Sequence, residues 1–396
     1  MKFFKHIILV LIATLLTLSG CSDKSDEPQP VEPTERTILV YMVAANSLGQ
    51  PLYVGGEKVQ ANDSADLDEM KKALPDKPAN VRWLVMHATY RGSSLMELTD
   101  KGFKTLKKYA PGYSTTAAFM TEVIDDVHSI APATDYGIVL WSHANGWLED
   151  SSDDTDISTL SFGLHGGHKM NTTTLSKILE GKGFSYIYFD CCLMGSIEVM
   201  YELHNSTDYI VSTQSEIPLD GMPYDRNLPL LCKGDLASLT QAATNTYTHY
   251  NTLPMEEDRT CAISVVATEG LDELAAATKE IYCNTLPEHP LSRVTNYYGS
   301  ASVRQGYYLD FGEYIEALIE RDAIDDDMSS RWREAMSKVV IYHASTEMLW
   351  NEWPMYNTSG MSTRVFNSAD NITVKGYDRL QWTQDVVAPR FNTIGQ

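Results

Sequence analysis

Two short stretches place a thiol and an imidazole directly after apolar runs. Residues 186–199 read YIYFDCCLMGSIEV, so Asp190, Cys191 and Cys192 follow four apolar residues. Residues 136–141 read YGIVLW, and His143 comes two positions later. A thiol whose proton is taken or shared by an imidazole attacks carbonyl carbons. The two stretches therefore indicate acyl transfer through a covalent intermediate, if the fold brings them together.

Alternating apolar and helical stretches predict a scaffold that does so. Residues 36–45 (RTILVYMVAA) and 80–89 (NVRWLVMHAT) are apolar runs typical of strands buried on both faces. Residues 64–74, 115–130 and 173–184 have apolar side chains at helical spacing. This alternation predicts an α/β fold with a mostly parallel sheet covered by helices on both faces. One crossover would then place His143 and Cys192 on the same rim of the sheet.

Strand geometry favours Cys192 over Cys191 as the nucleophile. Successive side chains of a strand point to opposite sides, so Asp190 and Cys192 share a side while Cys191 packs behind the strand. Apolar residues at helical spacing from Ile197 predict a helix soon after Cys192, and a helix N-terminus lowers the pKa of a nearby thiol. The backbone N–H of Cys192 and one from the residues after His143, such as Ala144, could form an oxyanion hole.

The same stretches resemble those of a known peptidase family. DCCLMGSIEV resembles the Asp-Ala-Cys-Leu-Met signature of the clostripain-like cysteine peptidases, which are relatives of caspases, gingipains and legumains. LWSHANGW resembles their Ser/Asp-His-Gly-Gly-Gly-Trp segment, and further similarity covers most of the chain after the first 36 residues. The resemblance implies a caspase-like three-layer α/β/α sandwich with a C-terminal extension, and a catalytic dyad of His143 and Cys192.

The resemblance also implies an acidic specificity pocket. Asp190 matches the family's aspartate that selects Arg or Lys before the scissile bond, and a carboxylate suits a guanidinium. Asp220, in PLDGMPY, would be a second acid of that pocket. The alternatives are a strand-end aspartate for Asp190 and a turn residue beside Gly221 for Asp220. The expected substrates are proteins or peptides that contain Arg or Lys.

Departures from the family pattern leave a second reading open. Ala144 and Asn145 stand where the family usually has glycines, which narrows the conformations open to that loop. The competing hypothesis is a surface-tethered binding protein that keeps the peptidase scaffold but has lost catalysis. Between His143 and Lys169 the chain has no Lys or Arg, so self-cleavage after a basic residue is not expected there.

No cofactor is predicted. The acidic run EDSSDDTD (149–156) lacks the Gly and terminal Glu of an EF-hand loop, so calcium stays an open possibility without a clear site. His165 and His168 lie in a Gly-rich stretch without a third ligand, which favours a loop over a metal site. The formal net charge of −22 makes nucleic acid an unlikely partner.

The first residues predict export. Lys2 and Lys5 precede an apolar run, and LSGC resembles a bacterial lipobox, so residues 1–21 are expected to be a lipoprotein signal peptide with Cys21 as the lipid-bearing residue. Residues 22–36 are rich in Pro, Glu, Asp and Ser and predict a flexible tether. A catalytic core (37–269) and a C-terminal subdomain of the same unit (270–396) would follow. We expect a monomer anchored by lipid to the bacterial envelope, at the outer membrane or the cell surface.

The remaining cysteines have two readings. Cys232, Cys261 and Cys283 are expected to be core residues, or one disulfide with a spare thiol.

Overall fold

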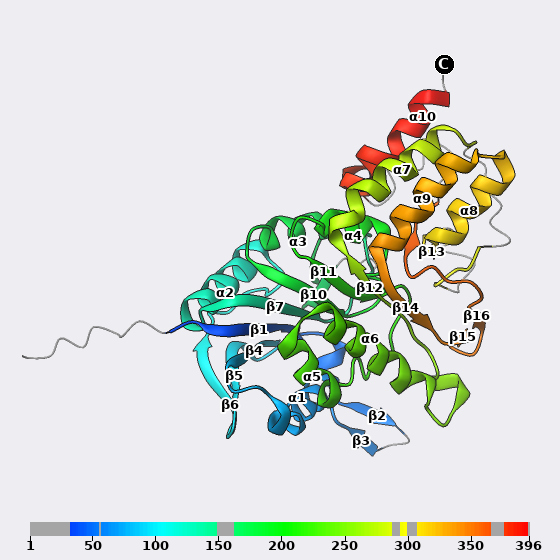
Figure 1. The fold of residues 1–396 in the computed structure, drawn as a ribbon. Helices are drawn as coiled ribbons and strands as arrows, with labels where there is room; N and C mark the ends of the chain where they lie inside the picture. The colour runs from blue at the N-terminus through cyan, green and yellow to red at the C-terminus, as the bar shows by residue number, and fades with distance from the viewer. Residues whose placement is uncertain are drawn as a thin grey trace, which may run out of the picture. The chain divides into compact units, whose positions relative to one another are not determined.

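In the described part of the chain, a nine-stranded sheet carries the functional residues (Figure 1). The computed structural model describes residues 32–54, 57–148, 162–286, 294–298, 307–365 and 376–394. Residues from Pro33 onward group into one compact unit. The predicted signal peptide and most of the predicted tether lie outside the described residues.

The five central strands are parallel, as the sequence predicted. The strand order is β14-β12-β11-β10-β7-β1-β4-β5-β6, and antiparallel strands flank the parallel group on both sides. The parallel strands are β1 (Thr34–Val43), β4 (Val81–Thr89), β7 (Ala133–Trp141), β10 (Phe184–Asp190) and β11 (Tyr209–Thr213). The antiparallel strands are β5 (Gly92–Thr99), β6 (Gly102–Lys108), β12 (Ala262–Ala267) and β14 (Val340–Ser345).

Burial on both faces explains the continuous apolar runs. Residues 37–43 of β1 are all buried, as expected for a strand between two helical layers. β1 begins at Thr34, two residues before the predicted start at Arg36, and Thr34 N donates to Pro132 O. Residues 34–36, which were predicted to belong to the tether, therefore form part of the sheet.

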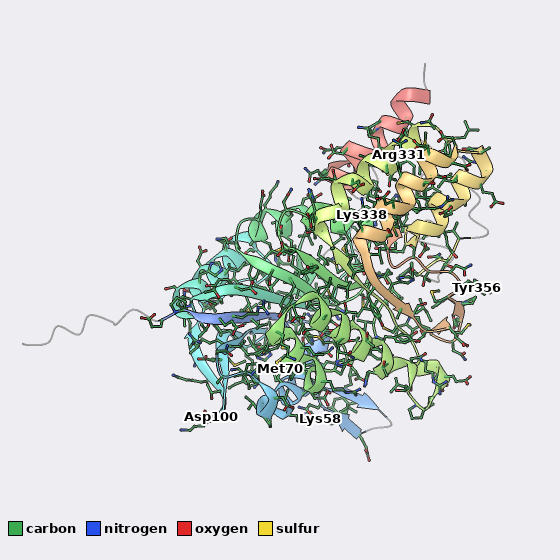
Figure 2. The ribbon with its side chains drawn as sticks, in the orientation of Figure 1. Lys58, Met70, Asp100, Arg331, Lys338 and Tyr356 are labelled. Atoms are coloured by element: carbon green, nitrogen blue, oxygen red, sulfur yellow. The ribbon has the colours of Figure 1, made fainter. Side chains whose placement is uncertain are left out.

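Helices cover both faces of the sheet (Figure 1). One face packs against α2 (Ala117–Ile130), α3 (Thr172–Leu179), α4 (Ile197–Leu203) and α7 (Leu271–Cys283). The other face packs against α1 (Asn62–Lys72), α5 (Tyr224–Lys233) and α6 (Leu236–Asn251). Figure 2 shows Met70 of α1 inside this second layer, while Lys58 and Asp100 lie at the periphery. The expected α/β sandwich with helices on both faces is confirmed.

Outside the nine-stranded sheet the described residues form further helices and short strand pairs. The added helices are α8 (Phe311–Asp322), α9 (Asp326–Val339), a π-helix (Thr383–Val387) and α10 (Ala388–Ile394). The short strands are β2 (Leu52–Val54), β3 (Glu57–Val59), β8 (Phe162–His165), β9 (His168–Met170), β13 (Leu309–Asp310), β15 (Met348–Leu349), β16 (Trp353–Pro354) and β17 (Ser362–Thr363). Ser362 N donates to Gly195 O, so β17 is tied to the loop that follows Cys192.

None of the helices in the described residues is both long enough and apolar enough to cross a bilayer.

Candidate active site

Two neighbouring parallel strands bring His143 and Cys192 to the same rim of the sheet. β7 and β10 pair in register, with Trp141 opposite Asp190 at their carboxyl ends. His143 and Cys192 each lie two residues beyond this pair. Adjacent strands lie about 4.8 Å apart, so the two side chains project from neighbouring positions. The topology predicted for the thiol and the imidazole is therefore the observed one.

The Cys192 thiol is half-buried and un-ionised. Its Sγ donates a long hydrogen bond of 3.9 Å to the carbonyl O of Ile217. Burial raises the pKa of Cys192 to about 12, and the nearby charges of Glu216 and Asp190 act in the same direction. The resting thiol is therefore a poor nucleophile.

The predicted effect of a helix N-terminus on this thiol is wrong. Residues 193–196 separate Cys192 from α4, which begins at Ile197 with Ser196 as its N-cap. Leu193 adopts a left-handed conformation with φ of 62°, which turns the chain before the helix. The first N–H groups of α4 are thus several residues away, and desolvation dominates the pKa of Cys192 instead.

The His143 imidazole is hydrogen-bonded to Ser47, a residue that the sequence analysis did not identify. Ser47 Oγ and His143 Nε2 share a hydrogen bond of 2.8 Å. Burial lowers the pKa of His143, so the imidazole is neutral at physiological pH. Among the described residues, no hydrogen bond joins His143 to Cys192, because each side chain is engaged elsewhere.

Cys191 is a core residue, as predicted. It is 2% exposed and belongs to the apolar cluster beneath α2, α3 and α4. Its backbone carbonyl accepts a hydrogen bond from Thr213 Oγ1 on the next strand. Burial raises the pKa of its thiol, so Cys191 is unsuited to nucleophilic chemistry.

The loop after His143 tolerates its two departures from the family pattern. Gly146 has a left-handed φ of 61°, and a Cβ there would lie 2.5 Å from Leu193 O. Neither Ala144 nor Asn145 has a positive φ. The only position of these three that requires glycine therefore still has it. An oxyanion hole from the Ala144 and Cys192 N–H groups stays a prediction.

Asp190 is a buried carboxylate with unused hydrogen-bonding capacity. Its side chain is 4% exposed, and Oδ1 accepts a hydrogen bond of 2.9 Å from Met222 N. The buried Tyr224 hydroxyl is a second, neutral donor that faces this carboxyl group. Burial raises the pKa of Asp190 to about 7. Such a carboxylate suits a ligand that brings both positive charge and N–H donors.

A second acidic residue behind the site escaped the sequence analysis. Asp66 of α1 is buried, and its Oδ2 accepts a hydrogen bond of 2.6 Å from Trp141 Nε1. Burial and then the charge of Asp190 raise the pKa of Asp66. Glu69, one turn further along α1, accepts a hydrogen bond from Tyr224 N. In the structure Asp66 shares the buried face of the helix with Asp63 and Met70, but no pattern in the polar sequence around it marks it as buried.

Asp220 is exposed and belongs to a tight turn. Gly221 N donates to Pro218 O and closes the turn, so the alternative reading of Asp220 as a turn residue describes its backbone correctly. Its charge nevertheless contributes to the raised pKa values of Asp66 and Glu69. A part for Asp220 in binding substrate remains a prediction.

A small cavity joins these groups. It has a volume of about 30 Å³ and lies between the strand ends at 141–143 and 190–192, the segment 217–221 and Leu48. This space holds one or two water molecules and is too small for the side chain of Arg or Lys. Segment 217–221 lies directly against Asp190, since a Cβ on Gly221 would lie 2.8 Å from Asp190 Oδ1. We refer to this space as the acidic cavity.

No disulfide joins any of the five cysteines in the described residues. Cys232 and Cys261 are buried, so the core reading holds for these two, whereas Cys283 is half-buried.

The described residues hold no cluster of three or more potential metal ligands. His165 and His168 lie on β8 and β9, which form a hairpin rather than the expected loop, and both rings pack against Tyr113. The acidic run 149–156 lies outside the described residues.

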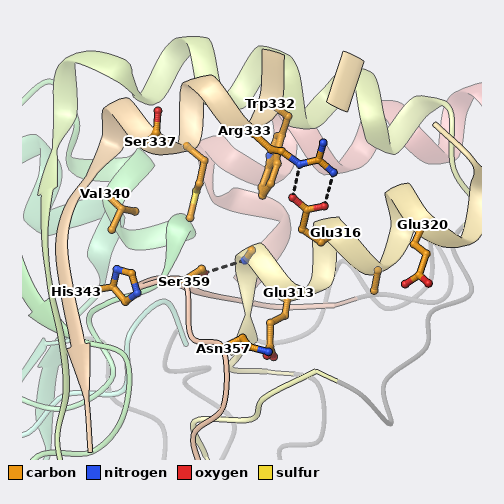
Figure 3. Close-up of a pocket in the computed structure, with 13 residues that line it drawn as sticks. Glu313, Glu316, Glu320, Trp332, Arg333, Ser337, Val340, His343, Asn357 and Ser359 are labelled. Atoms are coloured by element: carbon orange, nitrogen blue, oxygen red, sulfur yellow. Dashed lines mark hydrogen bonds and ion pairs between the residues drawn. The ribbon is translucent and has the colours of Figure 1, made fainter. Parts of the chain in front are cut away.

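A larger cavity of about 660 Å³ lies among α8, α9 and β14 (Figure 3). Its carboxylate Glu316 forms a two-pronged ion pair with Arg333, at 2.7 Å for each contact. Ser359 Oγ accepts a hydrogen bond from Gly312 N. Its described lining contains no cysteine, so His143 and Cys192 meet at the acidic cavity and not at this larger one.

The sequence model of the clostripain family (peptidase family C11) matches residues 40–382. An inactive zymogen of a C11 protease from Parabacteroides distasonis is 26% identical and has a TM-score of 0.74; the match covers 90% of this chain and 99% of that one. A secreted C11 cysteine protease from Bacteroides thetaiotaomicron, in complex with an irreversible peptide inhibitor, is 25% identical with a TM-score of 0.72, over 90% and 99% of the two chains. No curated protein matched the sequence.

Proposed function

Because the chain belongs to the clostripain family of cysteine peptidases, we propose that it hydrolyses peptide bonds that follow an Arg or Lys residue. The observation that carries the proposal is the meeting of three groups at one rim. His143 and Cys192 project from neighbouring strand ends, and the buried carboxylate of Asp190 lines the cavity beside them. No other class of chemistry uses this combination as directly.

In the proposed reaction the Cys192 sulfur attacks the carbonyl carbon of the scissile bond. His143 takes the thiol proton and later gives it to the departing amine. The N–H groups of Ala144 and Cys192 stabilise the negative oxygen of the tetrahedral intermediate. Water, deprotonated by His143, then hydrolyses the thioester and restores the free thiol.

Specificity in this proposal comes from the acidic cavity. Asp190 accepts hydrogen bonds from the guanidinium or ammonium group of the residue before the scissile bond, with Asp220 at the entrance. The neutral donors beside the buried Asp190 carboxyl group, Met222 N and the Tyr224 hydroxyl, support this, because the substrate would supply the missing positive charge.

Turnover requires two local rearrangements of the resting site. The Cys192 thiol must leave the Ile217 carbonyl and His143 must leave Ser47 before they can exchange a proton. The acidic cavity must also widen, because its volume of about 30 Å³ does not admit a basic side chain. Substrate binding or activation would supply the energy for both changes.

The test is release of a fluorophore from matched peptides that end in Arg, Lys, Asp or Ala, by the chain that lacks residues 1–21 and by its Cys192→Ala variant. Cleavage after Arg or Lys by the parent alone is the expected result, and it should be measured with reductant, with and without calcium. Equal rates for all four peptides would overturn the acidic pocket. Equal rates for parent and variant would overturn the nucleophile.

A tethered binding protein is the second candidate, because the resting cavity does not admit a basic side chain. The high pKa of Cys192, caused by burial, and the separation of thiol and imidazole favour it. An inert Cys192 that resists iodoacetamide even in the presence of basic peptides, together with no cleavage, would favour this candidate over the peptidase.

Export and anchoring form a further part of the proposal. Cys21 carries lipid and tethers the peptidase to the bacterial envelope, in line with the secreted relative from Bacteroides thetaiotaomicron. Incorporation of labelled palmitate into the full chain, and its loss in Cys21→Ser, is the expected outcome. Labelling that persists in the variant would contradict the assignment of Cys21.

A further inference from the structure

Asp66 is buried without a cation to balance it. The carboxylate lies on α1, is 2% exposed and forms no ion pair within the described residues. Its hydrogen bond comes from a neutral donor, Trp141 Nε1, at 2.6 Å. Burying a carboxylate is costly unless positive charge or several donors compensate. The burial of Asp66 therefore points to a function at the neighbouring acidic cavity.

Trp141 connects Asp66 to the acidic cavity. Trp141 and Asp190 are direct register partners on β7 and β10, and both line the cavity. The indole of Trp141 donates to Asp66, which does not itself line the cavity, whereas Asp190 does. Asp190 Oδ2 and the Tyr224 hydroxyl are both buried and face each other, so the donors beside this carboxylate are neutral. A charged donor is therefore the group that the carboxylate lacks.

We propose that Asp66 is a positioning residue for specificity, which acts through Asp190 and Trp141 to make the acidic cavity require a cationic side chain. This inference rests on the proposed function, and it adds a residue on α1 that the sequence patterns did not suggest. Two carboxylates that share a dry region cannot both ionise at low cost, so the empty cavity keeps a proton. A guanidinium or ammonium group that enters lets both ionise, and that proton leaves for solvent.

The groups facing Asp66 support this coupling. Among the described residues, the main influences on the titration of Asp66 and Asp190 include several acids and phenols but no Lys or Arg. Those that face the pair include Glu69 on α1, Asp220 in segment 217–221, Tyr188 on β10, Tyr224 on α5, Tyr250 on α6 and the thiols of Cys191 and Cys192. The substrate is thus the cation that this region lacks. A neutral side chain before the scissile bond would leave this proton on the carboxyl pair. Asp66 would then not strengthen the binding of that substrate.

Asp63 offers a matched control for the test. It lies one turn earlier on α1, is also buried at 4% exposure, and shares a hydrogen bond of 2.8 Å with His87 Nε2. Asp63 does not line the acidic cavity and is not among the main influences on the titration of Asp190. Asp63→Asn therefore removes a buried carboxylate from the same helix and leaves Asp66, Trp141 and Asp190 unchanged.

The first arm of the experiment is kinetic and compares the parent chain with Asp66→Asn and Asp63→Asn. For Arg and Lys peptides, kcat/KM of Asp66→Asn should fall about tenfold or more, mainly through KM. For Asp63→Asn the expected kcat/KM is within about twofold of the parent, as for a site outside the binding machinery. Melting temperatures check that all three chains fold. Equal behaviour of the two variants would overturn the inference.

The second arm measures protons and does not depend on turnover. In the Cys192→Ala background, an Arg-containing peptide amide is titrated by calorimetry near pH 6 in buffers of different ionisation enthalpy. The parent pocket should release a fraction of a proton on binding, and adding Asp66→Asn should abolish most of that release. Unchanged release would overturn the inference. Trp141→Phe, which removes the N–H that holds Asp66, should give the same direction if Asp66→Asn does not fold.

The two arms separate this inference from the proposed function. If the parent chain cleaves after Arg or Lys but Asp66→Asn matches Asp63→Asn, only the role of Asp66 fails. If the parent neither cleaves nor binds basic peptides, the proposed function fails and takes this inference with it.

Discussion

Ser47 and His143 share a hydrogen bond of 2.8 Å that spans 96 residues of sequence and engages the imidazole nitrogen Nε2. In the resting structure the hydroxyl competes with the thiol of Cys192 for the proposed catalytic base. A neutral hydrogen bond of this kind contributes about 0.5–1.5 kcal/mol.

We expect Ser47→Ala to raise the rate of Cys192 alkylation by iodoacetamide at pH 7.5 by about two- to tenfold, the factor that this energy corresponds to. Mass spectrometry of the labelled peptide checks that the modified residue is Cys192. A slower rate in Ser47→Ala would mean that Ser47 orients His143 for catalysis instead of restraining it.

The two adjacent cysteines should respond differently to alanine. Cys192→Ala removes the proposed nucleophile and is expected to abolish turnover. Cys191→Ala leaves the backbone carbonyl that Thr213 binds and deletes only a buried thiol, so it should keep most activity and lose about 1 kcal/mol of stability. Initial rates and urea unfolding measure the two effects, and the reverse pattern would sink the assignment of Cys192.

Asp190 should destabilise the fold at alkaline pH. Its pKa is raised by burial to about 7, above an unfolded value of about 3.9. Between these values the folded state binds more protons than the unfolded state, so this group's contribution to stability falls as pH rises to about 7 and stays low above it.

Asp190→Asn should therefore raise the melting temperature by a few degrees at pH 8. The gain should be smaller at pH 5, where the parent carboxyl is still largely protonated. Scanning fluorimetry at both pH values tests this. An equal gain at pH 5 and pH 8 would show that burial does not control the charge of Asp190.

Local patterns predicted the parts of the site that depend on strand order. The apolar runs before His143 and Cys192 are long and uninterrupted because β7 and β10 are buried on both faces, and such runs identify parallel strands. Their adjacency followed from a single crossover. Cys191 could likewise be assigned to the core, because strand alternation fixed which side it faces.

Tertiary contacts decided what local patterns could not. Asp66 looks like a solvated acid in the polar stretch SADLDEM, and only Trp141, 75 residues later, shows that it is buried. The hydrogen bond between Ser47 and His143 likewise joins residues that are distant in sequence, since they follow the neighbouring strands β1 and β7. The pKa of Cys192 was predicted in the wrong direction because residues 193–196 intervene before α4, and segment 217–221 desolvates the thiol. The contacts of Ser47 and Cys192 depend on loops whose paths the sequence does not specify, whereas that of Asp66 depends on how α1 packs against β7.

Gly221 should be needed for the acidic cavity and not only for its turn. Its φ is 63°, and a Cβ there would lie 2.8 Å from Asp190 Oδ1. Gly181 has a similar φ of 69°, but a Cβ at that position would meet nothing within 4 Å. Gly181→Ala therefore reproduces the left-handed strain of about 1 kcal/mol without the clash.

We expect Gly221→Ala to lower kcat/KM for Arg and Lys peptides by about tenfold or more, while Gly181→Ala leaves it within about twofold. Gly221→Ala should lose more stability in urea than Gly181→Ala, because its contact with Asp190 adds to the backbone strain that both variants bear. If Gly221→Ala kept full activity, segment 217–221 would have to swing away from Asp190 when substrate binds, and the added methyl group would then meet open space. That outcome would locate the opening of the cavity in this segment.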